Sequence, residues 1–117
     1  MIRTFIEVPL FTKRWSEIGL TDADLIQLQI MLLKDPESGL VIVGTGEIRK
    51  VRFPLENLGK SGSVRVCYTD FADYEVTYLI TAFAKKEQEN LTDDEKKVLR
   101  KLVKSLRDAE RDRRQLE

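Results

Sequence analysis

The chain has 117 residues, of which 42% are hydrophobic and 34% are charged, and its formal net charge is zero. This composition is sufficient for one domain with one hydrophobic core. The apolar runs are far shorter than the roughly 20 residues of a membrane-spanning helix, and the N-terminus lacks the apolar segment of a signal peptide. We therefore expect a single cytoplasmic domain over 1–117, without a membrane segment.

The chain contains no histidine and a single cysteine. Without histidine, the usual general base at neutral pH is missing, and so are the Ser-His-Asp and Cys-His catalytic arrangements. Cys67 has no partner for an internal disulfide and lies in an alternating apolar run, so we interpret it as a packed strand residue. Any catalysis therefore uses other side chains.

The first third of the chain is predicted to form a strand followed by two helices. Residues 3–8 are rich in β-branched and aromatic side chains and end at a proline, which favours a strand. Apolar residues recur at helical intervals over 10–18, and a glycine follows. Thr21 is typical of a helix N-cap, and this second, strongly apolar helix is expected to end near Lys34 because Pro36 follows.

The middle of the chain is predicted to form antiparallel strands. A short β-like run over 40–43 precedes an alternating segment over 47–53. The polar, glycine-containing connection 54–62 separates it from two longer strands over 64–69 and 74–83. The order of these segments indicates an antiparallel meander.

A third helix is expected near the C-terminus. Residues 92–95, Thr-Asp-Asp-Glu, have the pattern of a capping box, and the apolar residues within 98–106 form one stripe. Residues 107–117 are nearly all charged, so we expect a flexible tail there. Together the segments predict an α+β fold, in which an N-terminal strand and a two-helix hairpin pack on a mainly antiparallel sheet with a C-terminal helix.

Positive charge is concentrated in two segments. Residues 47–69 carry five basic and two acidic side chains, and residues 96–117 carry nine and four. Alternation places Lys50 and Arg52 on one face of their strand, and an adjacent antiparallel strand brings Arg65 beside them, roughly 5 Å away. Such a face is either an ordinary solvated basic surface or a site for phosphate.

Three short motifs follow the two-helix hairpin. They are Gly-Thr-Gly-Glu-Ile-Arg-Lys-Val-Arg at 44–52, Gly-Lys-Ser-Gly-Ser-Val-Arg-Val-Cys-Tyr at 59–68, and Ala-Lys-Lys-Glu-Gln-Glu-Asn-Leu-Thr at 84–92. Each motif is short, but the three in this order and context form a strong combined signal. In these residues the chain resembles the RelE/HigB toxin family, and the resemblance spans roughly residues 3–106.

The resemblance implies the toxin of a type II toxin-antitoxin system, with a RelE-like fold. Such a toxin is a ribosome-dependent endoribonuclease that inhibits translation by cleaving messenger RNA. The messenger's own 2′-OH attacks the adjacent phosphate, and neither a metal nor another cofactor is required. The resemblance also implies a cognate antitoxin, in HigB-like systems commonly a helix-turn-helix, HigA-like protein. The second helix, the sheet edges and the basic third helix are its candidate contacts.

The cleavage reaction needs a base, cations that stabilise the phosphate, and an acid for the leaving group. By resemblance, Lys50 and Arg52 take the base and substrate-positioning roles, because neighbouring arginine charges favour a neutral lysine. Arg65 is expected to stabilise the transition-state phosphate, and Lys86 to act as the leaving-group acid or its electrostatic support. Further RNA contacts are expected from Arg49, Lys60, Lys85 and Tyr68.

The chain departs from RelE at Thr92, which occupies the place of a functional tyrosine; Tyr68 and Tyr78 are the candidate substitutes. Two other interpretations stay open. One is a non-enzymatic toxin on the same fold, like the ParE inhibitors of DNA gyrase, against which the retained cationic residues argue. The other is an RNA- or ribosome-binding module whose cations contact phosphate without cleavage.

Overall fold

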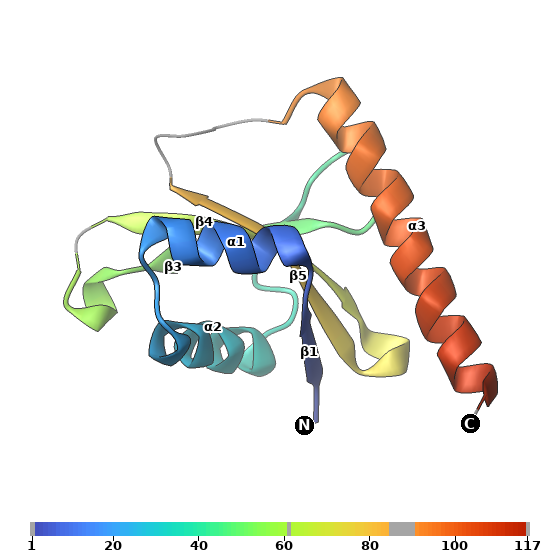
Figure 1. Cartoon of the computed structure of the whole chain (residues 1–117), viewed down its shortest axis with the longest axis horizontal. Coiled ribbons are helices and arrows are strands. Elements are labelled where there is room, and N and C mark those ends of the chain that lie inside the picture. The colour runs from blue at the N-terminus through green and yellow to red at the C-terminus, as the bar shows by residue number, and fades with distance from the viewer. Residues whose placement is uncertain (1, 61, 85–90, 117) are drawn as a thin grey trace.

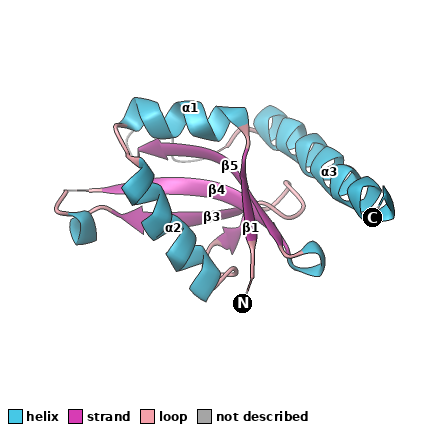
Figure 2. Ribbon diagram, turned by 60° about the horizontal axis from the view of Figure 1, so that its bottom comes forward, coloured by secondary structure: helices cyan, strands magenta, loops and turns pink. Residues whose placement is uncertain are grey.

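The computed structural model describes residues 2–60, 62–84 and 91–116. In these residues, three α-helices pack on a five-stranded mixed sheet (Figures 1 and 2). None of the helices described is both long and apolar enough to cross a bilayer. The elements in chain order are β1 (Thr4–Glu7), α1 (Pro9–Ile18), α2 (Asp22–Lys34), β2 (Leu40–Val41), β3 (Arg49–Pro54), β4 (Ser63–Phe71), β5 (Val76–Ala84) and α3 (Asp93–Leu116), with 3-10 turns at Glu56–Leu58 and Ala72–Tyr74.

The strands are arranged in the order β1-β5-β4-β3-β2. β1 pairs with β5 in parallel, and the other neighbours pair antiparallel. A β-bulge shifts the β4–β5 register between Cys67 and Tyr68, so that Cys67 lies opposite Thr81 and Tyr68 opposite Leu79. The predicted α+β fold is therefore confirmed, with β1 as the parallel member of a mainly antiparallel sheet.

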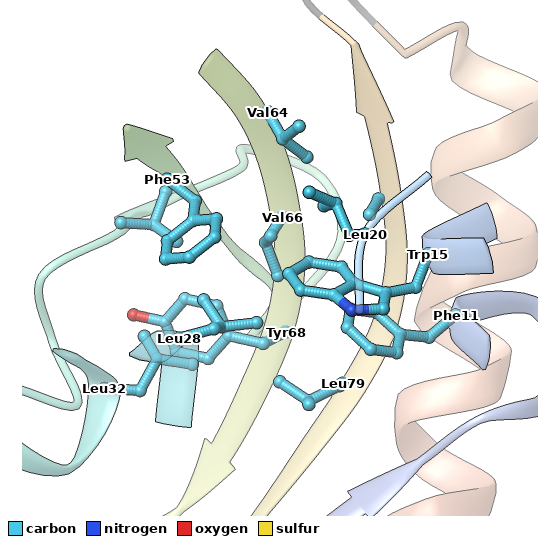
Figure 3. Close-up of a cluster of buried hydrophobic side chains, with 12 residues drawn as sticks. Phe11, Trp15, Leu20, Leu28, Leu32, Phe53, Val64, Val66, Tyr68 and Leu79 are labelled. Atoms are coloured by element: carbon cyan, nitrogen blue, oxygen red, sulfur yellow. The ribbon is translucent and has the colours of Figure 1, made fainter. Parts of the chain in front are cut away.

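The helices α1 and α2 cover one face of the sheet (Figure 2). The ring of Trp15 lies 5.2 Å from that of Phe11 and 5.8 Å from that of Phe53, measured between centroids. Figure 3 shows these aromatic side chains beside the aliphatic residues of α2, β4 and β5. Fully burying side chains of this size stabilises the fold by roughly 1.5–3 kcal/mol each. This burial against the sheet explains the apolar periodicity of α1 and α2.

Local signals fix where these helices begin and end. Gly19 ends α1 in the left-handed conformation, with φ of 92°, which glycine adopts without steric cost. Thr21 caps α2: its hydroxyl accepts from the backbone N–H of Asp24, and the Asp24 carboxylate accepts from the backbone N–H of Thr21. The predicted capping box at Thr92 and Glu95 is confirmed in the same way.

The helix α3 packs on the opposite face of the sheet. Its Val103 is buried in a second core cluster that contains Phe71 and Tyr78, and Leu102 and Leu106 pack against this cluster. In Figure 1, α3 lies at one end of the sheet, and β3 and β4 extend away from it. The two sheet faces are therefore covered to different extents.

The segment 107–116, where we expect a flexible tail, is helical, because α3 continues to Leu116. Arg107 forms ion pairs with Glu47 at 2.8 Å and Asp73 at 3.1 Å, and its guanidinium lies 4.3 Å from the centroid of the Phe71 ring. Glu110 is fully buried and accepts a hydrogen bond from a tyrosine hydroxyl of β5. These contacts of Arg107 and Glu110 hold the C-terminal half of α3 on the rest of the fold.

Candidate functional site

The register of β3 and β4 brings three predicted residues to one face of the sheet. Arg52 lies directly opposite Arg65, and Lys50 lies opposite Cys67. The intervening residues, such as Val51 and Val66, pack beneath α1 and α2. Because alternate strand residues point to opposite faces, Lys50, Arg52 and Arg65 project from the face that carries α3. We call these three residues the cation cluster.

The cation cluster lies on the part of this face that α3 leaves open. The helix packs on the end of the sheet built from Phe71, Val76 and Tyr78, whereas the cluster lies on β3 and the first residues of β4. Lys50 and Arg65 are half-buried, and the Arg52 side chain is 53% exposed. The cluster is thus open to a ligand approaching from the α3 side.

Both arginines of the cation cluster have a neighbour among the described residues. Arg52 forms an ion pair with Glu56 at 3.2 Å, but both side chains are half exposed, so the pair contributes little stability. Arg65 donates to the Ser63 hydroxyl at 3.1 Å. Like charges directly opposite each other destabilise a sheet. The direct opposition of Arg52 and Arg65 is therefore not explained by favourable strand pairing.

The thiol of Cys67 lies beneath this surface and takes no part in its chemistry. Cys67 is fully buried in the second core cluster. Burial raises the pKa of its thiol to about 11, although the nearby Lys50 charge acts in the opposite direction. The thiol is therefore protonated at neutral pH, in keeping with a packed strand residue.

The structure does not bring Arg49 and Tyr68 to the cation cluster. They lie opposite each other on the face beneath α1 and α2. Arg49 donates to the Gly39 carbonyl at 2.7 Å. Tyr68 is fully buried; its hydroxyl accepts from the Gly39 N–H and donates to the Pro36 carbonyl. Tyr68 is therefore not available for the RNA contact that we expect from the sequence. Instead, Arg49 and Tyr68 hold the α2–β2 connection on the sheet.

Lys60, another predicted RNA-binding residue, also lies outside the cation cluster. The Lys60 ammonium is 2.8 Å from the carboxylate of Asp24, and this hydrogen bond holds the Asp24 pKa below its ordinary value of 3.8. Lys60 thus ties the β3–β4 connection to the N-terminus of α2. Lys85 and Lys86 lie outside the described residues. Two residues that sequence reasoning missed, Glu56 and Ser63, hold the side chains of the cluster's arginines.

Tyr78, the second candidate for a functional tyrosine, is also unavailable. It is buried in the core beneath α3, and its hydroxyl donates to the Glu110 carboxylate. Burial and this carboxylate raise the pKa of Tyr78 to about 12. The two strand tyrosines suggested by the sequence are therefore both structural.

The structure is thus that of a small α+β protein with two arginines and a lysine on one face of a five-stranded sheet. A family model for the RelE toxin of the RelE/RelB toxin-antitoxin system matches residues 10–116. The chain therefore belongs to the RelE toxin family: it is a RelE-like toxin of a toxin-antitoxin system, and this membership implies an antitoxin as its partner.

A solved structure is similar in fold. It is that of a double-mutant form of the toxin RelE from E. coli in the free state, with a TM-score of 0.53 and 18% sequence identity. The match covers 76% of this chain and 90% of that chain. At this identity the likeness concerns the fold alone, and it agrees with the sheet and helix arrangement described above.

Proposed function

We propose that this toxin is a messenger RNA endoribonuclease that acts on the ribosome. Its reaction is a transesterification, in which the 2′-OH of one nucleotide attacks the adjacent phosphate and the 5′-oxygen of the next nucleotide leaves. The reaction needs no metal or other cofactor. The observation that carries the proposal is the placement of Lys50, Arg52 and Arg65 side by side on the open part of one sheet face.

Arg65 is suited to stabilise the phosphate as its charge increases. One nitrogen of its guanidinium is held by Ser63, which orients the planar group over the sheet. The remaining N–H donors match two phosphate oxygens, and the charge of arginine persists at every physiological pH. Removing one such preorganised donor costs about 100- to 1,000-fold in rate in comparable sites.

Lys50 and Arg52 flank the position that Arg65 defines. Lys50 occupies the row next to the arginine pair, over the apolar floor provided by Cys67. We assign Lys50 to the proton transfer from the 2′-OH, because its strand position places it beside the two arginines that bind the phosphate. Arg52, held by Glu56, positions the substrate phosphate. Lys86 stays our prediction for the leaving-group acid.

The biological setting follows from the same proposal. A toxin that cuts messages must be neutralised in the cell that makes it, so we propose a cytoplasmic complex with an antitoxin of the helix-turn-helix, HigA-like type. The antitoxin's contacts are the apolar residues of α2, the sheet edges or the basic helix α3. Cocrystallisation or crosslinking with the product of the adjacent reading frame distinguishes these surfaces.

The chemistry is tested with a synthetic message translated to a mapped cut site. We expect the wild-type toxin to leave a 2′,3′-cyclic phosphate on the 5′ fragment. A single 2′-deoxynucleotide at the attacking position removes the nucleophile, so the message should stay intact at that site only. Cleavage of the deoxy-substituted bond would overturn the mechanism. An intact wild-type message, combined with inhibition of DNA gyrase, would favour the ParE-like alternative.

A further inference from the structure

The leucine that begins β2 is among the most exposed large apolar side chains of the described residues. Leu40 is 81% exposed and lies directly opposite Lys50 in the β2–β3 pairing. Because cross-strand partners point to the same face of a sheet, Leu40 projects from the face that carries the cation cluster. Ile42, two residues further on, packs against the core cluster on that face, as this alternation requires. An apolar side chain therefore borders the cation cluster on the side of Lys50.

The backbone that presents Leu40 is held in place although its side chain is exposed. The preceding residue, Gly39, donates its N–H to the Tyr68 hydroxyl at 3.0 Å, and its carbonyl accepts from the Arg49 guanidinium at 2.7 Å. A Cβ atom at position 39 would lie only 3.0 Å from the Lys50 carbonyl oxygen, so glycine allows the close approach of the chain to β3 here. Leu40 is thus positioned beside Lys50 by contacts that its own side chain does not make.

The neighbours of Leu40 distinguish it from an ordinary exposed leucine, because scattered apolar residues occur on every protein surface. In an antiparallel pair, the Cβ atoms of opposite residues lie roughly 4.5–5.5 Å apart, and diagonal neighbours lie roughly 7–8 Å apart. Lys50 is the opposite residue of Leu40, and Arg52 is a diagonal one. Val41, the other residue of β2, is 46% exposed and points to the opposite face. Leu40 is therefore the residue of β2 that shares a surface with the cation cluster.

The proposed transesterification needs more than cations on the phosphate. The attacking 2′-oxygen must stand in line with the departing 5′-oxygen, and a stacked strand does not hold the ribose in that arrangement. Phosphate contacts fix the register of a nucleic acid strand but do not hold its bases. Proteins hold the bases of single-stranded RNA by packing them on side chains, and leucine is among the apolar residues that part stacked bases. An apolar group beside the residue that takes the proton meets this requirement.

We propose that Leu40 packs against the base of the nucleotide whose 2′-OH attacks. The inference deepens the proposed function and rests on it. Lys50, which takes the proton of this 2′-OH in the proposed reaction, is the direct neighbour of Leu40, whereas Arg52 and Arg65 lie in the next row. An antitoxin strand paired with the edge of β2 is the rival occupant. The adjacent cations, and an edge strand of only two residues, favour the message instead.

The test is the rate at which a synthetic message on programmed ribosomes is cut in a single turnover at saturating toxin. A normal message is compared with one that has an abasic nucleotide at the attacking position, which keeps the ribose, the 2′-OH and the phosphate. Leu40→Ala removes the proposed contact from the protein, and Leu40→Phe replaces it with an aromatic one. Val41→Ala is the matched control on the other face of the same strand. Circular dichroism melting checks that each variant is folded.

We expect Leu40→Ala to cut the normal message roughly fivefold more slowly than the wild type, which is the low end for the loss of one packed base. Leu40→Phe should cut it at least as fast as the wild type, and Val41→Ala should match the wild type. On the abasic message, the wild type and Leu40→Ala should be equally slow, because the base that Leu40 contacts is missing.

Equal rates of wild type and Leu40→Ala on the normal message would overturn the inference. The same fivefold ratio on the abasic message would also overturn it, because Leu40 would then act on something other than the base. A Leu40→Ala variant that cuts normally but no longer binds the antitoxin would assign Leu40 to that partner instead. A wild type that leaves the normal message intact would overturn the proposed function, and this inference with it.

Discussion

At the Phe71 end of β4, Asp70 accepts two hydrogen bonds from Arg3, at 3.0 and 3.2 Å, and one from Thr77 at 2.6 Å. The Arg3 and Asp70 side chains are each only 8% exposed. At the other end of β4, Arg65 faces another arginine on an open surface. The same residue type thus serves the fold where a buried carboxylate meets it, whereas at the open end of β4 only Arg52 of the pair meets a carboxylate, that of the half-exposed Glu56.

The largest effect on stability is expected for Arg3→Ala. This change leaves the Asp70 carboxylate buried beside only a threonine hydroxyl, and breaking a buried ion pair costs roughly 3–5 kcal/mol. Urea denaturation measures the free energy of unfolding. The double variant Arg3→Met/Asp70→Leu should recover much of the loss because it removes both charges. If Arg3→Ala lowered the free energy of unfolding by less than about 1 kcal/mol, the buried pair would contribute no more than an exposed one.

A smaller loss is expected for Arg107→Ala, which removes two ion pairs and the contact with the Phe71 ring. The Arg107 side chain is 35% exposed, so solvent weakens the pairs, and we expect about 1–2 kcal/mol. Thermal melting, with hydrogen exchange of the α3 amides, tests this. Unchanged melting and unchanged protection after Leu106 would show that these charges do not hold the helix.

Lys60→Gln should cost less than about 1 kcal/mol at neutral pH, because Lys60 is partly exposed. The folded-state pKa of Asp24 is lowered by Lys60, so the pair contributes stability above the ordinary carboxyl pKa of 3.8. This contribution is lost as the pH falls through the lowered value. The difference between wild type and variant should therefore shrink in acid, and message cleavage should stay within about twofold. A stability difference between wild type and variant that grows as the pH falls would contradict this pH dependence.

The smallest effect on stability is expected for Arg52→Ala. The change removes an exposed pair with Glu56 and also the like-charge contact with Arg65, and these contributions oppose each other. The free energy of unfolding should change by less than about 0.5 kcal/mol, while message cleavage falls. A destabilisation above about 1 kcal/mol would show that Arg52 is structural, like Arg3.

Much of this arrangement could be predicted from the sequence, because strand alternation and helix caps are local signals. The spacing of Lys50 and Arg52 places them on one face whatever the rest of the chain does. The same rule places Arg49 on the other face, so its separation from the cluster was predictable. The prediction that Arg65 lies beside them required only that the two strands be antiparallel neighbours, as they are.

The features that sequence reasoning missed depend on partners far away in the chain. The Tyr68 hydroxyl is used by backbone groups of Pro36 and Gly39, which no local pattern reveals. The charged C-terminal segment stays helical because Arg107 meets Glu47, 60 residues earlier. Composition alone favours a frayed tail there, and only the tertiary contacts decide otherwise.

The central claim is that Arg65 acts on phosphate and not on the fold. The direct test measures unfolding and cleavage of a translated message on the same preparation of Arg65→Ala, with Arg111→Ala as an exposed control on α3. We predict at least about 100-fold slower cleavage, with a free energy of unfolding within about 0.5 kcal/mol of the wild type. Near-normal cleavage by the folded Arg65→Ala variant would contradict the account.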